Sequence, residues 1–502
     1  MDNNQTPPDK PAGDNGSPGG APGGSNANIS HSGATTLSES ATVNQPSYSS
    51  TTGGQNALLV TGGEITLESP TVTKSGDESS EDSDFYGTNA AVLATGGTLT
   101  INGGTVTTDA AHANGIFAYD DGKIVVKNTT IKTTRNNSGG IMVTGGGSLT
   151  AENVTAETSG NSSAPIRSDR GGGTMTVTGG SYTSNGVGSP AIYSTATITV
   201  KNAKLVSNAS EGVVIEGKNS ASLTNVTLVD TNNTLNGNSE TYKNIFIYQS
   251  MSGDAEEGVG SFYSNGSDIT TNQGDTFFVT NTTAEIELTG NKFVNNDENS
   301  AFLRVQAGKW GTSGSNGGQV KLALTSQVVE GDLVLDDIST LNLVFSGQSY
   351  YMGVINGANT AKSVTVNLDA TSQIVLAGDS YVSALTNADS TNQNIYSNGY
   401  KLYVAGQEVT VNNGQAPAVP EVASQTQTET TAETTEVAQA NSQKTDLLPF
   451  IIGGAVLLVI VVAVIAFVLH SKKKKQSPKT PEAPETPDIV MPNTPTTPPI
   501  SQ

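Results

Sequence analysis

The sequence predicts an all-β solenoid with three short strands in each coil, followed by one transmembrane helix near the C-terminus. Residues 95–120 (TGGTLTINGGTVTTDAAHANGIFAYD) contain three stretches of alternating apolar and polar residues, separated by glycine and asparagine corners. Alternation with a period of two is typical of a half-buried strand. The pattern recurs along the chain, and a separate apolar run at residues 447–469 has the length of a membrane span.

The repeat has an almost constant length. The apolar residue of the first strand recurs at steps of 25, 25, 26, 23 and 25 residues, at Leu99, Ile124, Leu149, Met175, Ile198 and Leu223. Each of the first five is followed after seven residues by a second-strand residue, at Val106, Ile131, Ala156, Tyr182 and Leu205. Each is followed after seventeen residues by a third-strand residue, at Ile116, Ile141, Ile166, Ile192 and Ile215. Fixed offsets predict that equivalent strands stack about 4.8 Å apart.

These coils resemble those of right-handed parallel β-helix proteins of the pectin-lyase-like kind. They are most similar to adhesin-like surface proteins of Gram-positive bacteria, whose coils carry the pattern GG-x-[LI]-x-[IV]. The resemblance covers roughly residues 35–412 and implies a right-handed, single-stranded parallel β-helix. It implies no particular activity, because the same coil carries lyases, hydrolases and pure binding proteins.

The chain divides into five parts by composition. The span LLPFIIGGAVLLVIVVAVIAFVL has no charge and is followed by four lysines, which by the positive-inside rule places the tail in the cytoplasm. We therefore expect a single-pass protein of the cell membrane with its solenoid outside. The opening MDNNQTPP lacks the pattern of a signal peptide, so we expect the natural start to lie upstream or the chain to be processed. The predicted parts are a disordered Gly/Pro-rich spacer (1–34), the β-helix (35–412), a flexible Thr/Glu-rich stalk (413–446), the transmembrane helix (447–469) and a basic, then Pro/Thr-rich cytoplasmic tail (470–502).

Composition excludes several classes of function. The chain has no cysteine, so disulfides and thiolate metal sites are excluded. A net charge of −22 repels nucleic acid, so no nucleic-acid partner is expected. Histidine is limited to three positions, and the Asp120–Asp121 and Asp336–Asp337 pairs lack accompanying histidine and lysine. Asp169 is expected to pair with Arg167 or Arg170. We therefore predict no enzymatic activity.

Two insertions and one outward-facing strip are the predicted functional features. Ten extra residues lie between Ile65 and Val92 and seven between Leu223 and Ile247, each between a second and a third strand. Both loops should therefore project from the same side, where binding usually resides. The predicted binding strip beside them consists of Phe117, Tyr119, Arg167, Tyr193, Phe246 and Tyr248. The alternative is that these aromatic residues only stabilise the sheet by cross-strand stacking.

The first insertion is acidic and is a weak candidate for a calcium site. Its carboxylates would have to converge on one ion, whereas a solvated run of charge is the favoured interpretation, so no cofactor is expected. The asparagine and threonine corners are expected to form side-chain ladders between coils. The candidate metal ligands are Asp77, Glu78, Glu81, Asp82 and Asp84.

Together these features predict a membrane-anchored bacterial cell-surface β-helix protein that binds glycan or protein partners as an adhesin does. One alternative is a polysaccharide-active enzyme, either a lyase or a glycoside hydrolase, and another is a structural surface spacer. An enzyme would show carboxylates converging on one face, a binding protein would show the aromatic strip exposed, and a spacer would show neither.

Overall fold

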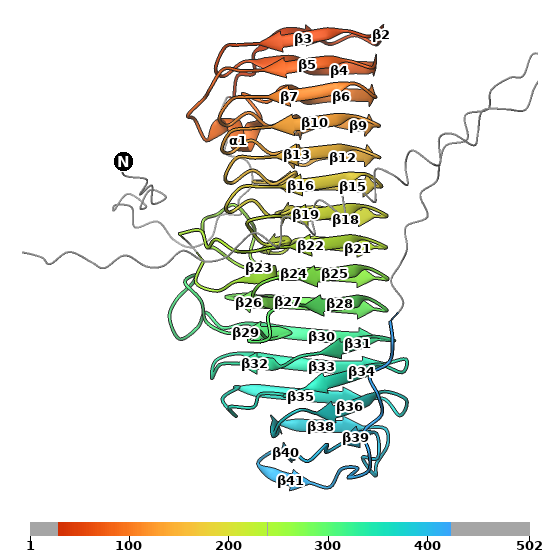
Figure 1. Ribbon diagram of the computed structural model, residues 1–502. Coiled ribbons are helices and arrows are strands. Elements are labelled where there is room, and N and C mark those ends of the chain that lie inside the picture. The colour runs from red at the N-terminus through yellow and green to blue at the C-terminus, as the bar shows by residue number, and fades with distance from the viewer. Residues whose placement is uncertain (1–28, 238, 423–502) are drawn as a thin grey trace, which may run out of the picture. The chain divides into compact units, whose positions relative to one another are not determined.

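The described part of the chain is a parallel β-solenoid of about 15 turns (Figure 1). The structure is a computed structural model that describes residues 29–237 and 239–422. Within these residues, no helix is long and apolar enough to cross a membrane. The predicted transmembrane helix at 447–469 and the predicted tail at 470–502 lie outside the described residues.

A regular coil contributes three strands, and equivalent strands of successive coils pair in parallel. Second strands form a 10-stranded sheet, which a 4-stranded sheet follows. First and third strands are joined into one 24-stranded sheet. The join arises because β4 (Asn56–Glu68) and β6 (Val92–Asn102) each run through both positions.

The strand bounds follow from this order. The second strands are β3 (Ser47–Ser50), β5 (Thr71–Lys74), β7 (Thr105–Thr108), β10 (Thr130–Thr133), β13 (Thr155–Thr158), β16 (Ser181–Ser184), β19 (Lys204–Ser207), β22 (Thr227–Asp230), β25 (Asp268–Thr271) and β28 (Lys292–Asn295), then β31 (Val328–Glu330), β34 (Tyr350–Gly353), β36 (Gln373–Leu376) and β39 (Ile395–Tyr396). The first strands are β2 (Ala41–Asn44), β9 (Lys123–Lys127), β12 (Gly147–Glu152), β15 (Gly173–Thr178), β18 (Thr197–Lys201), β21 (Ser220–Thr224), β24 (Val259–Asn265), β27 (Thr283–Thr289), β30 (Gln319–Thr325), β33 (Thr340–Ser346), β35 (Ser363–Leu368) and β38 (Ala384–Asn387). The third strands are β1 (Gly33–Leu37), β8 (Ile116–Tyr119), β11 (Ile141–Thr144), β14 (Ile166–Ser168), β17 (Ile192–Ser194), β20 (Val213–Glu216), β23 (Lys243–Tyr248), β26 (Asp275–Thr280), β29 (Leu303–Val305) and β32 (Leu333–Leu335).

The last coil ends differently. β37 (Ser380–Val382) pairs in parallel with β40 (Leu402–Val404), and β40 turns back to pair antiparallel with β41 (Gln407–Val409). The C-terminal end of the stack therefore finishes in a hairpin rather than in another parallel strand.

The predicted register is confirmed over the first four steps of the repeat. Leu99 pairs with Ile124, and Ile141 pairs with both Ile116 and Ile166. The second-strand residues also pair in the predicted order, ending at Leu205.

The last predicted step is wrong by two residues. Ile198 pairs with Ala221 rather than with Leu223, and Ile192 pairs with Val213 rather than with Ile215. The connection from β19 to β20 is two residues shorter than the preceding ones. Side chains two apart on a strand face the same side, so a slip of two leaves an equally apolar pattern.

Asparagine occupies the corner that follows the first strand in several coils. Asn128, Asn153, Asn202 and Asn225 all have a φ between 51° and 53°. Asparagine tolerates this left-handed conformation because its short side chain bonds locally. The Asn225 amide donates to the side-chain oxygen of Asn202 at 3.4 Å, so the predicted ladder forms at this step.

Both predicted insertions are present, and the structure adds two more. The first, residues 75–91, contains the short helix α1 (Asp82–Tyr86), and the second is residues 231–242. The sequence analysis missed residues 249–258, between β23 and β24, and residues 306–318, between β29 and β30. All four adjoin the third strands, and the loops project from the side of the stack that carries α1 (Figure 1).

Both predicted ends of the solenoid need correction. The spacer ends earlier than predicted, since Gly33 begins β1 and the ring nitrogen Nε2 of His31 lies 2.9 Å from the Tyr86 carbonyl oxygen. Residues 413–422 are not a free stalk, because they run back beside β34 and β31 (Figure 1). The Tyr350 hydroxyl donates to the Pro417 carbonyl at 3.4 Å.

Candidate functional site

The six predicted binding residues lie on one face of the solenoid. Phe117, Met142, Arg167, Tyr193, Val214 and Phe246 pair in sequence across successive third strands. Tyr119 and Tyr248 lie two residues further along their strands and face the same way. The predicted placement of the strip is therefore confirmed.

Its predicted exposure is wrong at several positions. Phe117 is fully buried and packs with Leu59, Leu93 and Met142 in a small cluster outside the solenoid interior. The side chain of Arg167 is 11% exposed, and Tyr248 is buried. The reason is the insertions: residue Gly87, just after α1, lies against the Phe117 ring, so the first loop covers this end of the strip.

The aromatic residues at the other end contact one another and a buried carboxylate. Phe246 and Tyr248 stack with ring centroids 4.4 Å apart, and Trp310 of the loop 306–318 lies 5.9 Å from Tyr248. The hydroxyls of Tyr193 and Tyr248 donate to Glu216 at 2.6 and 2.9 Å. Burial raises the pKa of both tyrosines well above the ordinary value, so both remain neutral donors.

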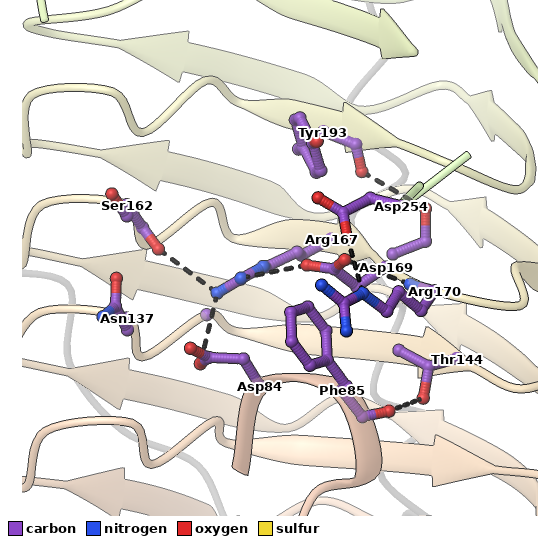
Figure 2. A network of polar contacts seen from close by, with 12 residues as sticks. Asp84, Phe85, Asn137, Thr144, Ser162, Arg167, Asp169, Arg170, Tyr193 and Asp254 are labelled. Atoms are coloured by element: carbon purple, nitrogen blue, oxygen red, sulfur yellow. Dashed lines mark hydrogen bonds and ion pairs between the residues drawn. The ribbon is translucent and has the colours of Figure 1, made fainter. Parts of the chain in front are cut away.

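An ion network ties α1 to the third strands (Figure 2). Asp84 of α1 lies 2.8 Å from Nδ1 of His112, and its other oxygen lies 3.8 Å from Nη1 of Arg167. Arg167 Nη2 donates to Asp169 at 3.1 Å, which confirms the predicted pairing of Asp169. The bond to Asp84 raises the pKa of His112, since it favours the charged imidazolium.

A second pair of contacts ties the loop 249–258 to the same place. Arg170 Nε donates to Asp254 at 2.5 Å, while the guanidinium lies 3.7 Å from the centre of the Phe85 ring (Figure 2). The Thr144 hydroxyl donates to the Phe85 carbonyl at 2.6 Å. Two insertions 84 residues apart at their contact point are thus fixed on one face.

Asp169 is the most perturbed acid of this network. Burial raises its pKa to about 7, the nearby Arg167 opposes the rise, and the negative charges of Asp254 and Asp84 add to it. At neutral pH the Asp169 carboxyl is therefore close to half protonated.

Two adjoining cavities follow this face, and together we call them the third-strand groove. The larger holds about 350 Å³ and the smaller about 110 Å³, and both are lined by Gly188, Pro190 and Tyr193. The charged end is lined by Glu81, Asp84, His112, Arg167, Asp169 and Asp254. The aromatic end is lined by Tyr193, Phe246, Tyr248 and Trp310.

The acidic insertion forms no metal site. Asp77 accepts from the Ala111 amide at 2.8 Å, and Glu78 accepts from the Ser79 amide at 2.7 Å. Asp82 is exposed, whereas Asp84 is buried and paired, so the run is only partly solvated. Across residues 29–422, with 238 left aside, no three histidine, aspartate or glutamate residues are grouped to hold a metal ion.

Several residues of the groove had no signal in the sequence. His112, Asp254 and Trp310 occupy corners or loops where no periodic pattern places a side chain. Comparisons with protein-family models, curated proteins and solved structures give no match. The function of the groove is therefore inferred from its geometry.

Proposed function

We propose that this chain is a cell-surface protein whose third-strand groove binds a glycan. Residues 447–469 would anchor it in the cell membrane, with the solenoid outside and residues 470–502 in the cytoplasm. A right-handed winding belongs to the same proposal, because about 98% of parallel crossover connections are right-handed. The similarity of the coils to adhesin-like surface proteins supports this placement.

The observation that carries the proposal is the groove itself. Its aromatic end offers the faces and edges of four rings, which pack against the apolar face of a sugar ring. Its charged end offers carboxylates and amides that hydrogen-bond to hydroxyls. Stacked strands and two ion-paired loops hold both ends rigid, so little entropy is lost when a ligand binds.

The aromatic end provides its own reporter. Trp310 is the single tryptophan of the chain. Its fluorescence should change in a saturable way when the full-length chain is titrated with a binding glycan. Trp310→Ala should weaken binding about tenfold or more, as measured by calorimetry, because a central aromatic anchor is lost.

The matched control is Tyr400→Ala, which removes an exposed aromatic residue near the C-terminal end of the solenoid. This variant should bind like the wild type. If Trp310→Ala retains the full affinity while its circular dichroism is unchanged, the groove is not the binding site.

The membrane topology has an independent test. Protease added to intact cells should remove the solenoid and leave the segment after residue 470 protected. The check is a pair of immunoblots against the two parts. Recovery of the uncut solenoid under conditions that cleave a known surface protein would exclude this orientation.

A polysaccharide-active enzyme is the second candidate, and Asp169 is the observation that favours it. A carboxyl with a pKa of about 7 can donate a proton to a leaving sugar oxygen at neutral pH, while Asp84 and Asp254 face the same cavity. In that case glycan bound in the groove should be cleaved, and Asp169→Asn should abolish the release of new reducing ends without loss of binding. Intact glycan after prolonged incubation with the wild type would leave binding alone.

A further inference from the structure

We infer that the third-strand groove selects glycans that carry protonated amino groups over glycans that carry carboxylates. The inference rests on the proposed function and specifies its ligand class. It runs against the acidic sugars that the pectin-lyase-like resemblance would suggest, and the charge of the groove is the reason.

The charged end has more carboxylates than cations. Four acids, Glu81, Asp84, Asp169 and Asp254, line it together with two basic side chains, Arg167 and His112. Both basic groups already have carboxylate partners: His112 is bonded to Asp84, and Arg167 lies between Asp84 and Asp169. No basic side chain that lines this cavity is left to compensate the charge of a uronate, so a carboxylate ligand would enter uncompensated.

One buried acceptor in the cavity is left without a donor. Asp84 is only 6% exposed, and its Oδ1 accepts no hydrogen bond within the described residues. The nearest cationic group, Arg167 Nη1, lies 3.8 Å away, beyond hydrogen-bonding distance. An ammonium group carries three donors and a positive charge, and it matches this acceptor, whereas a carboxylate carries acceptors only.

A further carboxylate stands at the rim. Glu81 is exposed, lines the same cavity and forms no ion pair or side-chain hydrogen bond within the described residues. Its charge is therefore available to a ligand without breaking an internal contact. This distinguishes it from Asp169 and Asp254, which are engaged with Arg167 and Arg170.

The two ends of the groove suit the two parts of an amino sugar. Rings rest on the aromatic end, while amino groups on neighbouring units reach the charged end. Tyr193 lines both cavities and joins the ends, and its hydroxyl is occupied by Glu216, so it presents its ring rather than a free donor. A linear oligomer of unacetylated amino sugars fits this arrangement better than a single sugar.

The test uses the full-length chain and three probes of equal length: oligomers of β-1,4-linked glucosamine, of N-acetylglucosamine and of galacturonate. Binding is followed by Trp310 fluorescence and calorimetry at mildly acid pH, where the glucosamine amines are protonated. The glucosamine oligomer should bind about tenfold or more tightly than either of the others. Galacturonate or N-acetylglucosamine binding as tightly as glucosamine would overturn the inference and leave the proposed function in place.

Because the chain carries a net charge of −22, a cationic oligomer is attracted to it nonspecifically, and the variants separate the two effects. Glu81→Gln should weaken glucosamine binding about threefold to tenfold. Glu39→Gln removes the same charge from an exposed position outside the groove and should leave binding unchanged. Equal effects of the two variants would overturn the inference, and so would glucosamine binding that survives Trp310→Ala. If none of the three oligomers nor any other glycan binds, it is the proposed function that fails.

Discussion

Ile141→Asp should unfold the solenoid far more readily than Thr130→Asp, although the two residues belong to the same coil. Ile141 is fully buried on β11 between Ile116 and Ile166 of the neighbouring coils, whereas Thr130 is exposed on β10. The new carboxylate inside the stack has no cation to pair with, and burying it costs several kcal/mol. On the outside it remains in water.

Thermal unfolding followed by circular dichroism measures the difference. We expect the midpoint of Ile141→Asp to fall by many degrees, or the variant to fail to fold, while Thr130→Asp stays near the wild type. Equal midpoints would mean that Ile141 does not face the interior.

Arg167→Met should be the most damaging substitution in the groove. Arg167 is the cation shared by Asp84 and Asp169, and all three side chains are at most 11% exposed. Removing one partner of a buried ion pair leaves charge uncompensated and typically costs about 3–5 kcal/mol. We expect a lower free energy of unfolding and release of α1, measured by chemical denaturation and by hydrogen exchange of residues 82–86.

The pH dependence of this loss distinguishes charge from packing. The pKa of Asp169 in the folded chain, about 7, lies above its ordinary value of 3.8, so the folded form binds the proton more tightly. The group therefore favours folding most at low pH, and its contribution is lost as pH rises from about 4 to about 7. The deficit of Arg167→Met should grow over the same range, and Asp169→Asn in its background should restore part of it. A deficit independent of pH would assign the effect to lost packing.

The features with a period in the sequence could be predicted, and the features made by contacts between loops could not. The offset from Leu99 to Ile116 predicted the strand order, and the surplus before Val92 predicted the loop that contains α1. The burial of Phe117 depends on that loop folding back over β8, which no local pattern encodes. The contact between Arg170 and Asp254 joins residues 84 apart on two unrelated insertions. Asp84 is hidden in an acidic run whose other members face water or bond to the backbone.

The return of residues 413–422 along the solenoid has a mechanical consequence. After β41 the chain runs back, and Val419 and Val422 line a cavity with Phe293 and Val328, where β28 gives way to β31. Tension applied to the chain beyond residue 422 therefore reaches this segment before it reaches any coil. The segment is held by few contacts and peels away residue by residue, releasing up to about 33–36 Å of slack before β41 carries load. It acts as a fuse in series with the rod, extending under a pull that leaves the groove and its ion pairs undisturbed.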